Sequence, residues 1–128
     1  MKTIVPALLA LIAVEGRTQD YDSFVNGTML LQPCEVQTPH AQATCNAYIA
    51  GIHDLHDTFV AWGDMQNLWC IPKYVILPQL QYFVVGELTA SAETLGRSAS
   101  THVANALIKT YPCEPAPTTK GSQGERRP

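Results

Sequence analysis

The sequence has 128 residues and a formal net charge of −3 at pH 7; 46% of the residues are hydrophobic and 15% are charged. This length suits one small domain with one core and is too short for two domains. Residues 18–114 include nine acidic and three basic side chains, so the body of the protein carries a charge near −6. An acidic body argues against nucleic-acid binding and favours a basic protein partner, although solubility alone explains it equally well.

The first sixteen residues, MKTIVPALLALIAVEG, have the pattern of a secretory signal peptide. One lysine precedes an apolar run at residues 4–14, which is shorter than the ~20 residues that span a bilayer and matches the apolar segment of an export signal. We expect cleavage after Gly16 and export to the periplasm. The alternative interpretation is a buried N-terminal helix. No other segment is apolar enough to cross a membrane, so we expect no membrane contact after cleavage.

The next residues predict two helices from apolar positions spaced three and four apart and from end signals. The first covers residues 20–31, and the Asn-Gly pair at 26–27 weakens its middle because glycine costs about 1 kcal/mol inside a helix. The second begins at Thr38 and Pro39, which are a favourable N-cap and a favourable first helical residue. It ends at Gly63. Its apolar stripe comprises Cys45, Tyr48, Ile49, Ile52, Leu55 and Phe59.

A connector at residues 65–76 then leads to a third helix at residues 77–91 and a fourth that opens at Ser98 or Ser100 and runs to Tyr111. Residues 115–128 are rich in proline and polar side chains, which predicts a disordered tail. No convincing strand pair is found. The sequence therefore predicts an all-α domain at residues 17–114, a small bundle of four to five helices.

Four cysteines in a short exported chain predict two disulfides, and three pairings are possible. No C-x-x-C pair is present, which disfavours a metal site. Cys34 follows the first helix and Cys45 lies in the first turns of the second, so a bridge between them would staple that corner. If the third and fourth helices are antiparallel, Cys70 before one meets Cys113 after the other.

The segment GIHDLHD at residues 51–57 is the strongest candidate for chemistry in the chain. On a helix His56 falls within the apolar stripe, His53 lies at its edge, and His53 and Asp57 form an i,i+4 pair. The two histidines diverge by about 60° on a helical wheel, and no third ligand is fixed beside them. We therefore expect a packed helix with a polar shoulder, with no metal, cofactor or catalytic residue.

Three segments resemble the Tai-type (Rap/Tai) immunity proteins linked to type VI secretion. They are CNAYIAGIHD at 45–54, WCIPKYVILPQLQYFVVGEL at 69–88 and ANALIKTYPC at 104–113. The residues that match the family pattern are Cys45, Tyr48, Ile49, Gly51, Cys70, Pro72, Val75, Gln79, Leu80, Tyr111, Pro112 and Cys113. One departure is Ile76, where the family usually has a Ser or Thr that caps the third helix; Lys73-Tyr74 also replace a commoner Pro-Gly.

The resemblance implies a periplasmic, non-enzymatic inhibitor that acts as a homodimer and plugs the groove of a secreted peptidoglycan amidase. The partner-binding residues we expect are exposed positions in and beside the connector: Trp62, Asp64, Gln66, Asn67 and Trp69. Aromatic side chains near an exposed loop often dominate binding energy. The alternative is that Trp69 packs beneath the loop and Trp62 completes the core stripe.

Two other functions fit the sequence. One is a disulfide-stapled periplasmic module without a toxin partner, such as a stress chaperone or an envelope assembly factor, whose binding depends on acid through its four histidines. The other is a metal-dependent enzyme that uses His53, His56 and His102. A toxin partner would separate the first from the immunity function, and metal analysis would decide the second.

Overall fold

The computed structural model describes residues 23–90 and 92–114. It confirms the all-α class, and the part described holds no β-strand beyond one isolated bridge. The elements are α1 (Gly27–Glu35), α2 (Pro39–Trp62), α3 (Leu77–Ala90), the short 3-10 helix η1 (Ala92–Thr94) and α4 (Ala99–Thr110). The predicted signal peptide and tail lie outside the described residues. Within them, no helix has the length and apolar character that a membrane span requires.

The start of α1 differs from the sequence expectation. The predicted helix at 20–31 is wrong in both bounds, because the Asn-Gly pair marks the beginning of the helix and not its middle. The side chain of Asn26 accepts a hydrogen bond from the backbone N–H of Met29 at 3.0 Å, as an N-cap does. Gly27 is buried so tightly that an added Cβ would lie 2.9 Å from the carbonyl oxygen of Leu95. Glycine is therefore needed for close approach.

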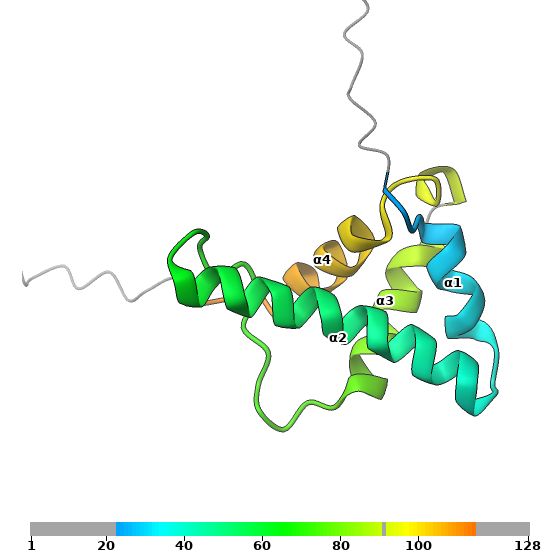
Figure 1. The fold of residues 1–128 in the computed structure, drawn as a ribbon, viewed down its shortest axis with the longest axis horizontal. Helices are drawn as coiled ribbons and strands as arrows, with labels where there is room; N and C mark the ends of the chain where they lie inside the picture. Colours follow the sequence, from blue (N-terminus) through cyan, green and yellow to red (C-terminus); the bar gives the residue numbers. More distant parts are fainter. Residues whose placement is uncertain (1–22, 91, 115–128) are drawn as a thin grey trace, which may run out of the picture.

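Helix α2 confirms the predicted boundaries. The Thr38 hydroxyl accepts from the N–H of Ala41 at 3.3 Å, and Pro39 occupies the first turn, where a missing N–H costs nothing. Gly63 ends the helix in the left-handed conformation with φ 79°, which glycine adopts without strain. The 24 residues between make α2 the longest element, and it lies across the other helices (Figure 1).

Helix α3 begins without a side-chain cap from Ile76, as the sequence indicated. The backbone N–H of Ile76 instead donates to the side-chain oxygen of Gln79 at 3.0 Å, which is half of a capping box. This contact shows how the chain accommodates an isoleucine at a position where a hydroxyl would normally cap.

Helix α4 begins at Ala99, one residue after Ser98, and Ser98 makes no side-chain cap. The sequence analysis missed η1. The bridge between Asn26 and Ser98 joins the start of α1 to the start of α4, supported by hydrogen bonds from the Gly27 N–H to the Arg97 oxygen and from the Ala99 N–H to the Val25 oxygen. These contacts place the N-terminus of the described chain beside α4.

The core forms where α2, α3 and α4 meet, with α1 closing one end. Its most deeply buried side chains are Ile49, Leu88, Leu107, Val84, Val103 and Cys45. Both predicted disulfides are present: Cys34–Cys45 joins α1 to α2, and Cys70–Cys113 joins the segment before α3 to the segment after α4. Leu55 was expected in the core stripe, but its side chain is 52% exposed and lines an open hollow beside Ser100, Thr101 and Ala104 of α4.

Candidate functional site

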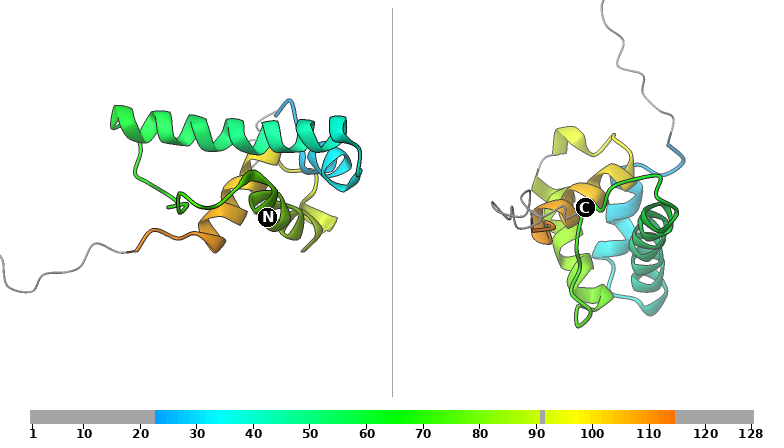
Figure 2. Two further views of the ribbon diagram at one scale, coloured as in Figure 1. Left: turned by 90° about the horizontal axis from the view of Figure 1, so that it is seen from below. Right: turned by 90° about the vertical axis from the view of Figure 1, so that its left-hand side faces the viewer.

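The connector, which the sequence placed at residues 65–76, covers residues 63–76 in the structure. It leaves the far end of α2 and returns beneath it to α3 (Figure 2). It contains no helix or strand. The middle is tied to the end of α4 twice: by the Cys70–Cys113 disulfide, and by a hydrogen bond from the Cys70 N–H to the Tyr111 oxygen at 2.8 Å. The connector is therefore a surface segment held in one place.

The structure places the predicted partner-binding residues in two groups. Trp62, Asp64, Gln66 and Asn67 are exposed, and the Trp62 side chain reaches 69% exposure. The expectation that Trp69 is also exposed is wrong, since only 3% of it is accessible. The alternative for Trp69, packing beneath the loop, is confirmed, whereas the alternative for Trp62, completion of the core stripe, is wrong.

Trp69 is buried against the two histidines of GIHDLHD. Its ring stacks on that of His56, with the centroids 3.9 Å apart and the planes 21° apart. Its indole N–H donates to Nδ1 of His53 at 3.0 Å. The preceding residue, Leu68, is bound to the other histidine: its backbone N–H donates to Nε2 of His56 at 3.0 Å. Two histidines of α2 thus hold two consecutive residues of the connector.

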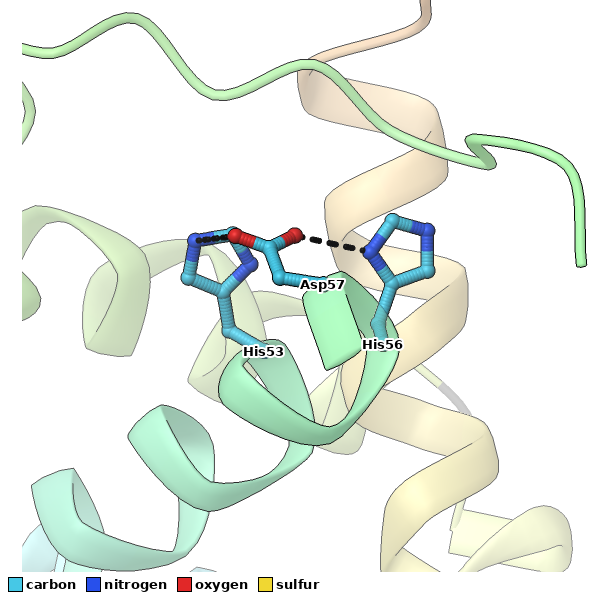
Figure 3. A group of neighbouring side chains, drawn as sticks. All are labelled: His53, His56 and Asp57. Carbon is cyan, nitrogen blue, oxygen red and sulfur yellow. Dashed lines mark hydrogen bonds and ion pairs between the residues drawn. The ribbon is translucent and has the colours of Figure 1, made fainter. Parts of the chain in front are cut away.

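The remaining ring nitrogens face one carboxylate (Figure 3). Nδ1 of His56 lies 3.1 Å from one oxygen of Asp57, and Nε2 of His53 lies 3.6 Å from the other. The predicted i,i+4 pair is therefore confirmed, as is the burial of His56 in the apolar stripe. The expected divergence of the two histidines is wrong: ligand atoms of His53, His56 and Asp57 all lie within 4.8 Å of one another. A helical wheel gives the directions of Cβ atoms, and the side chains are long enough to turn back toward each other.

Hydrogen bonding decides what this group can do. An indole N–H and a backbone N–H can only donate, so Nδ1 of His53 and Nε2 of His56 must be unprotonated acceptors. A neutral ring then carries its proton on the other nitrogen, and in both rings that N–H points at Asp57. A metal ion between the three residues would bind the ring nitrogens that face Asp57, and these would have to lose their protons. Each neutral ring would then carry its proton on the other nitrogen, where it would meet the N–H donors of Trp69 and Leu68. The donor set does not fit a metal while the connector is in place.

His102, the third ligand considered from the sequence, lies elsewhere. Its Nε2 is 2.8 Å from the carbonyl oxygen of Thr94, and it is buried beside Gly27. It therefore joins α4 to η1 and takes no part in the His53 group. A nearby link between α2 and α4 is Tyr48, whose pKa is raised by burial and lowered in part by its hydrogen bond to Ser100.

Two hollows flank Trp69. A groove of about 620 Å³ lies between α2 and the connector, and its polar lining includes His53, Asp54, Asp57, Asn67 and Lys73. A smaller hollow of about 300 Å³ has a mostly apolar lining that includes Leu55, Phe59, Met65, Leu68 and Ala104. The surface around the connector therefore offers both an acidic groove and an apolar depression.

A family model for Rap1a immunity proteins matches residues 26–113 of this chain. The chain belongs to the Rap1a immunity protein family. The match begins at the residue that caps α1 and ends at the second cysteine of the connector disulfide, so it includes both disulfides. No curated protein matches the sequence. Membership in the Rap1a family indicates a role in immunity to a type VI effector and a protein effector as the partner; such proteins are generally not enzymes.

Sequence reasoning missed the central feature of this Rap1a protein, the pair of histidines that hold the connector. The hydrogen bonds from Leu68 and Trp69 span 12 and 16 residues. Nothing in the periodicity of α2 reports on such contacts. The available signal was the choice of residues: a tryptophan, which has one N–H donor, follows a helix that carries two histidines three residues apart.

Proposed function

We propose that this protein is a periplasmic immunity protein that binds a type VI secretion peptidoglycan amidase and blocks its cleft with the connector. The single observation that carries the proposal is the connector itself. It exposes Asp64, Gln66 and Asn67, it follows directly on the exposed Trp62 at the end of α2, and a disulfide fixes its middle. The proposed binding residues are these four, with Trp69 supporting them from beneath.

The fixed middle of the connector favours tight binding. A flexible loop loses conformational entropy when it enters a cleft, at about 0.5–1.5 kcal/mol for each side chain that becomes immobile. Here Cys70 is bonded to Cys113, and the Trp69 ring of the connector already stacks on His56 of α2 before a partner binds. Less ordering remains to be done on binding, so more of the contact energy appears as affinity.

The charge of this region supports a basic partner. Asp54 and Asp57 line the groove, and Asp64 is exposed at the end of α2. Lys73 is the one basic side chain among the residues lining the groove. Complementary charge accelerates encounter and is weakened by salt. We expect association with the effector to slow markedly as ionic strength rises.

The cysteines support the proposed compartment. Two disulfides in a small domain are typical of an oxidising environment such as the periplasm. We also propose a homodimer, as the Tai-type resemblance implies. Light scattering on the purified protein tests this: a mass near twice that of one chain supports it, and the mass of one chain removes it.

The proposed function is tested with residues 17–128 and the peptidoglycan amidases that type VI systems of its own strain and of competing strains secrete. A stoichiometric complex with one amidase, and loss of peptidoglycan hydrolysis in proportion to the complex, is the expected result. Failure of every amidase to bind would remove the amidase as partner.

A matched pair of variants then locates the surface. Trp62→Ala should weaken the complex about tenfold or more, because exposed aromatics at binding segments often dominate affinity. Met29→Ala removes an exposed side chain from α1, away from the connector, and should leave the affinity unchanged. Equal effects of the two substitutions would show that the connector is not the binding surface.

One observation favours a second function, a stress chaperone without a toxin partner. Leu55, Met65 and Leu68 expose apolar surface around the smaller hollow, and such surface could hold unfolded chains. Suppression of the aggregation of unrelated proteins at low pH, with no amidase bound, would support this function over immunity.

A further inference from the structure

Both connector anchors depend on histidine being neutral. Nδ1 of His53 accepts the Trp69 indole N–H, and Nε2 of His56 accepts the Leu68 N–H, each at 3.0 Å. A protonated imidazole carries a proton on both nitrogens and accepts from neither. Protonation of either ring therefore places one N–H against another, and that anchor is lost.

We propose that His53 and His56 are positioning residues that hold the binding connector only while they are neutral, so that the protein releases its effector as the pH falls. This inference rests on the proposed function, because it regulates the same surface. Histidine is the side chain whose ordinary pKa places its change of charge between about pH 5 and 8.

The residues around the two histidine rings determine how the rings respond to protonation. From α2, Asp57 faces both rings, and Asp54 lies on the same groove wall. From the connector, Lys73 lines the groove; α3 contributes Leu77 and Leu80. The α4 residues beside His56 are uncharged: Ser100, Thr101 and Ala104.

Asp57 therefore decides where a protonated ring goes. An imidazolium forms a charged hydrogen bond with the carboxylate that already faces it, at 3.1 Å from His56 and 3.6 Å from His53. Each ring keeps Asp57 in both states and holds the connector in one state only. At acid pH, hydrogen bonds from the connector to neutral imidazoles are thus replaced by an ion pair between residues of α2.

The disulfide limits the change to the first half of the connector. Cys70 stays tied to Cys113 whatever the histidines do. Trp69, Leu68 and the exposed residues before them are free to leave α2 up to Gly63. The segment that loses its position is the one that presents Asp64, Gln66 and Asn67.

The first test needs no effector. Hydrogen exchange of the Trp69 indole N–H and the Leu68 amide is measured by NMR between about pH 8 and pH 5 and expressed as protection relative to intrinsic exchange. We expect protection at both sites to fall roughly tenfold or more toward acid pH, as expected when one hydrogen bond is lost. The exposed Trp62 indole serves as an internal reference. Constant protection at Trp69 and Leu68 would overturn the proposal.

Matched variants separate positioning from simple packing. His53→Asn and His56→Gln together place amide oxygens near the two accepting nitrogens and cannot titrate. The double variant should keep its connector protected at both ends of the pH range, whereas His40→Gln, at an exposed position of α2, should retain the wild-type profile. The same pH dependence in the double variant would sink the proposal. His102 is present in every variant, so any contribution from it is common to all the profiles.

A second substitution guards against a double variant that folds poorly. Asp57→Asn removes the anion that stabilises the imidazolium, so Trp69 should lose protection only at a lower pH than in the wild type. A profile that does not move would contradict the assigned role of Asp57.

The functional consequence is measured with the bound amidase. The ratio of the dissociation constants at about pH 5.5 and pH 8 should be at least tenfold greater for the wild type than for the double variant, which shares any pH dependence of the enzyme itself. A wild-type ratio equal to that of the double variant overturns the regulation. Absence of an amidase complex at any pH removes the proposed function, while the exchange result still decides whether the histidines hold the connector.

Discussion

The corner between α1 and α2 and the connector solve the same problem with different side chains. In both, a segment without regular structure carries polar groups that side chains of a neighbouring helix satisfy by hydrogen bonding. At the corner, the amide nitrogen of Gln42 donates to the carbonyl oxygens of Cys34 and Val36 at 3.2 and 2.8 Å, and that of Gln81 donates to Cys34 at 3.1 Å. At the connector, histidines accept from Leu68 and Trp69.

The difference lies in how the two sets of hydrogen bonds respond to conditions. Glutamine amides keep the same donors and acceptors at every physiological pH, whereas an imidazole loses its acceptor on protonation. The corner disulfide is also buried, while Cys70 of the connector disulfide is exposed. The corner is built as a permanent part of the core, and the connector is built as a surface whose position depends on pH.

Removal of each disulfide breaks this comparison most strongly. The chain-entropy account ties stabilisation to the length of the closed loop, and the separations are 43 residues for Cys70–Cys113 and 11 for Cys34–Cys45. We expect Cys70→Ala/Cys113→Ala to lower the free energy of unfolding by about 4 kcal/mol and Cys34→Ala/Cys45→Ala by about 3 kcal/mol. Urea denaturation measures both. Only the first variant should also weaken effector binding; equal loss of binding would show that the corner contributes to the surface.

A methyl group at Gly27 sharpens the view that the corner end belongs to the core. Gly27→Ala brings Cβ within 2.9 Å of the Leu95 oxygen and 3.0 Å of the His102 ring, and we expect a loss of about 2 kcal/mol in thermal unfolding. Gly51→Ala is the control, since no atom lies within 4 Å of its added Cβ. There we expect a gain of up to about 1 kcal/mol, because alanine favours the helix interior. A neutral Gly27→Ala would refute the close packing.

Two glutamines on α3 separate the regions with a smaller effect. Gln79→Ala removes the acceptor for the Ile76 N–H, and Gln81→Ala removes a donor to Cys34; each should cost about 1 kcal/mol of stability. Only Gln79→Ala should also lower effector affinity, because it loosens the end of the connector. Calorimetry of unfolding and of binding measures both quantities, and a drop in affinity for Gln81→Ala would contradict the separation.

The smallest effect concerns the ion pair between α3 and α4, which serves neither region. Lys109 Nζ lies 2.6 Å from a Glu87 oxygen, but the lysine side chain is 67% exposed. Lys109→Met should change stability by less than about 1 kcal/mol. The difference should vanish in about 1 M salt, where charges are screened within about 3 Å. A larger loss that persists in salt would indicate a packing role for the lysine stem.

Local sequence signals predicted the helix boundaries correctly where a few adjoining residues determine them. Thr38, Pro39 and Gly63 mark the ends of α2 because capping and left-handed glycine are properties of a few adjoining residues. The Cys34–Cys45 bridge was expected because a short loop joins the two helices, and Cys70–Cys113 was expected on the condition that the third and fourth helices are antiparallel; the structure has both bridges. Asn26 was misread because its capping role depends on where α1 packs, and the tight fit of Gly27 against Leu95 is a contact between distant segments.

The candidate site shows the same limit more sharply. The helical period placed His56 inward and paired His53 with Asp57, and both predictions are confirmed. It could not show that the free nitrogen of each ring reaches the connector, since that depends on the path of a segment without regular structure. Trp69 was taken for an exposed residue for the same reason. Whether the exposed connector residues contact an effector stays a prediction.

The long helix α2 has a consequence for how this protein can change over generations. A helix of 24 residues is about 36 Å long, and beyond His56 it contributes no buried residue. The end of this helix and the first part of the connector, residues 61–68, are exposed, whereas Trp69 of the connector belongs to the core. Under the proposed function, substitutions at this exposed end would change recognition of an effector and leave the buried side chains of the core in place.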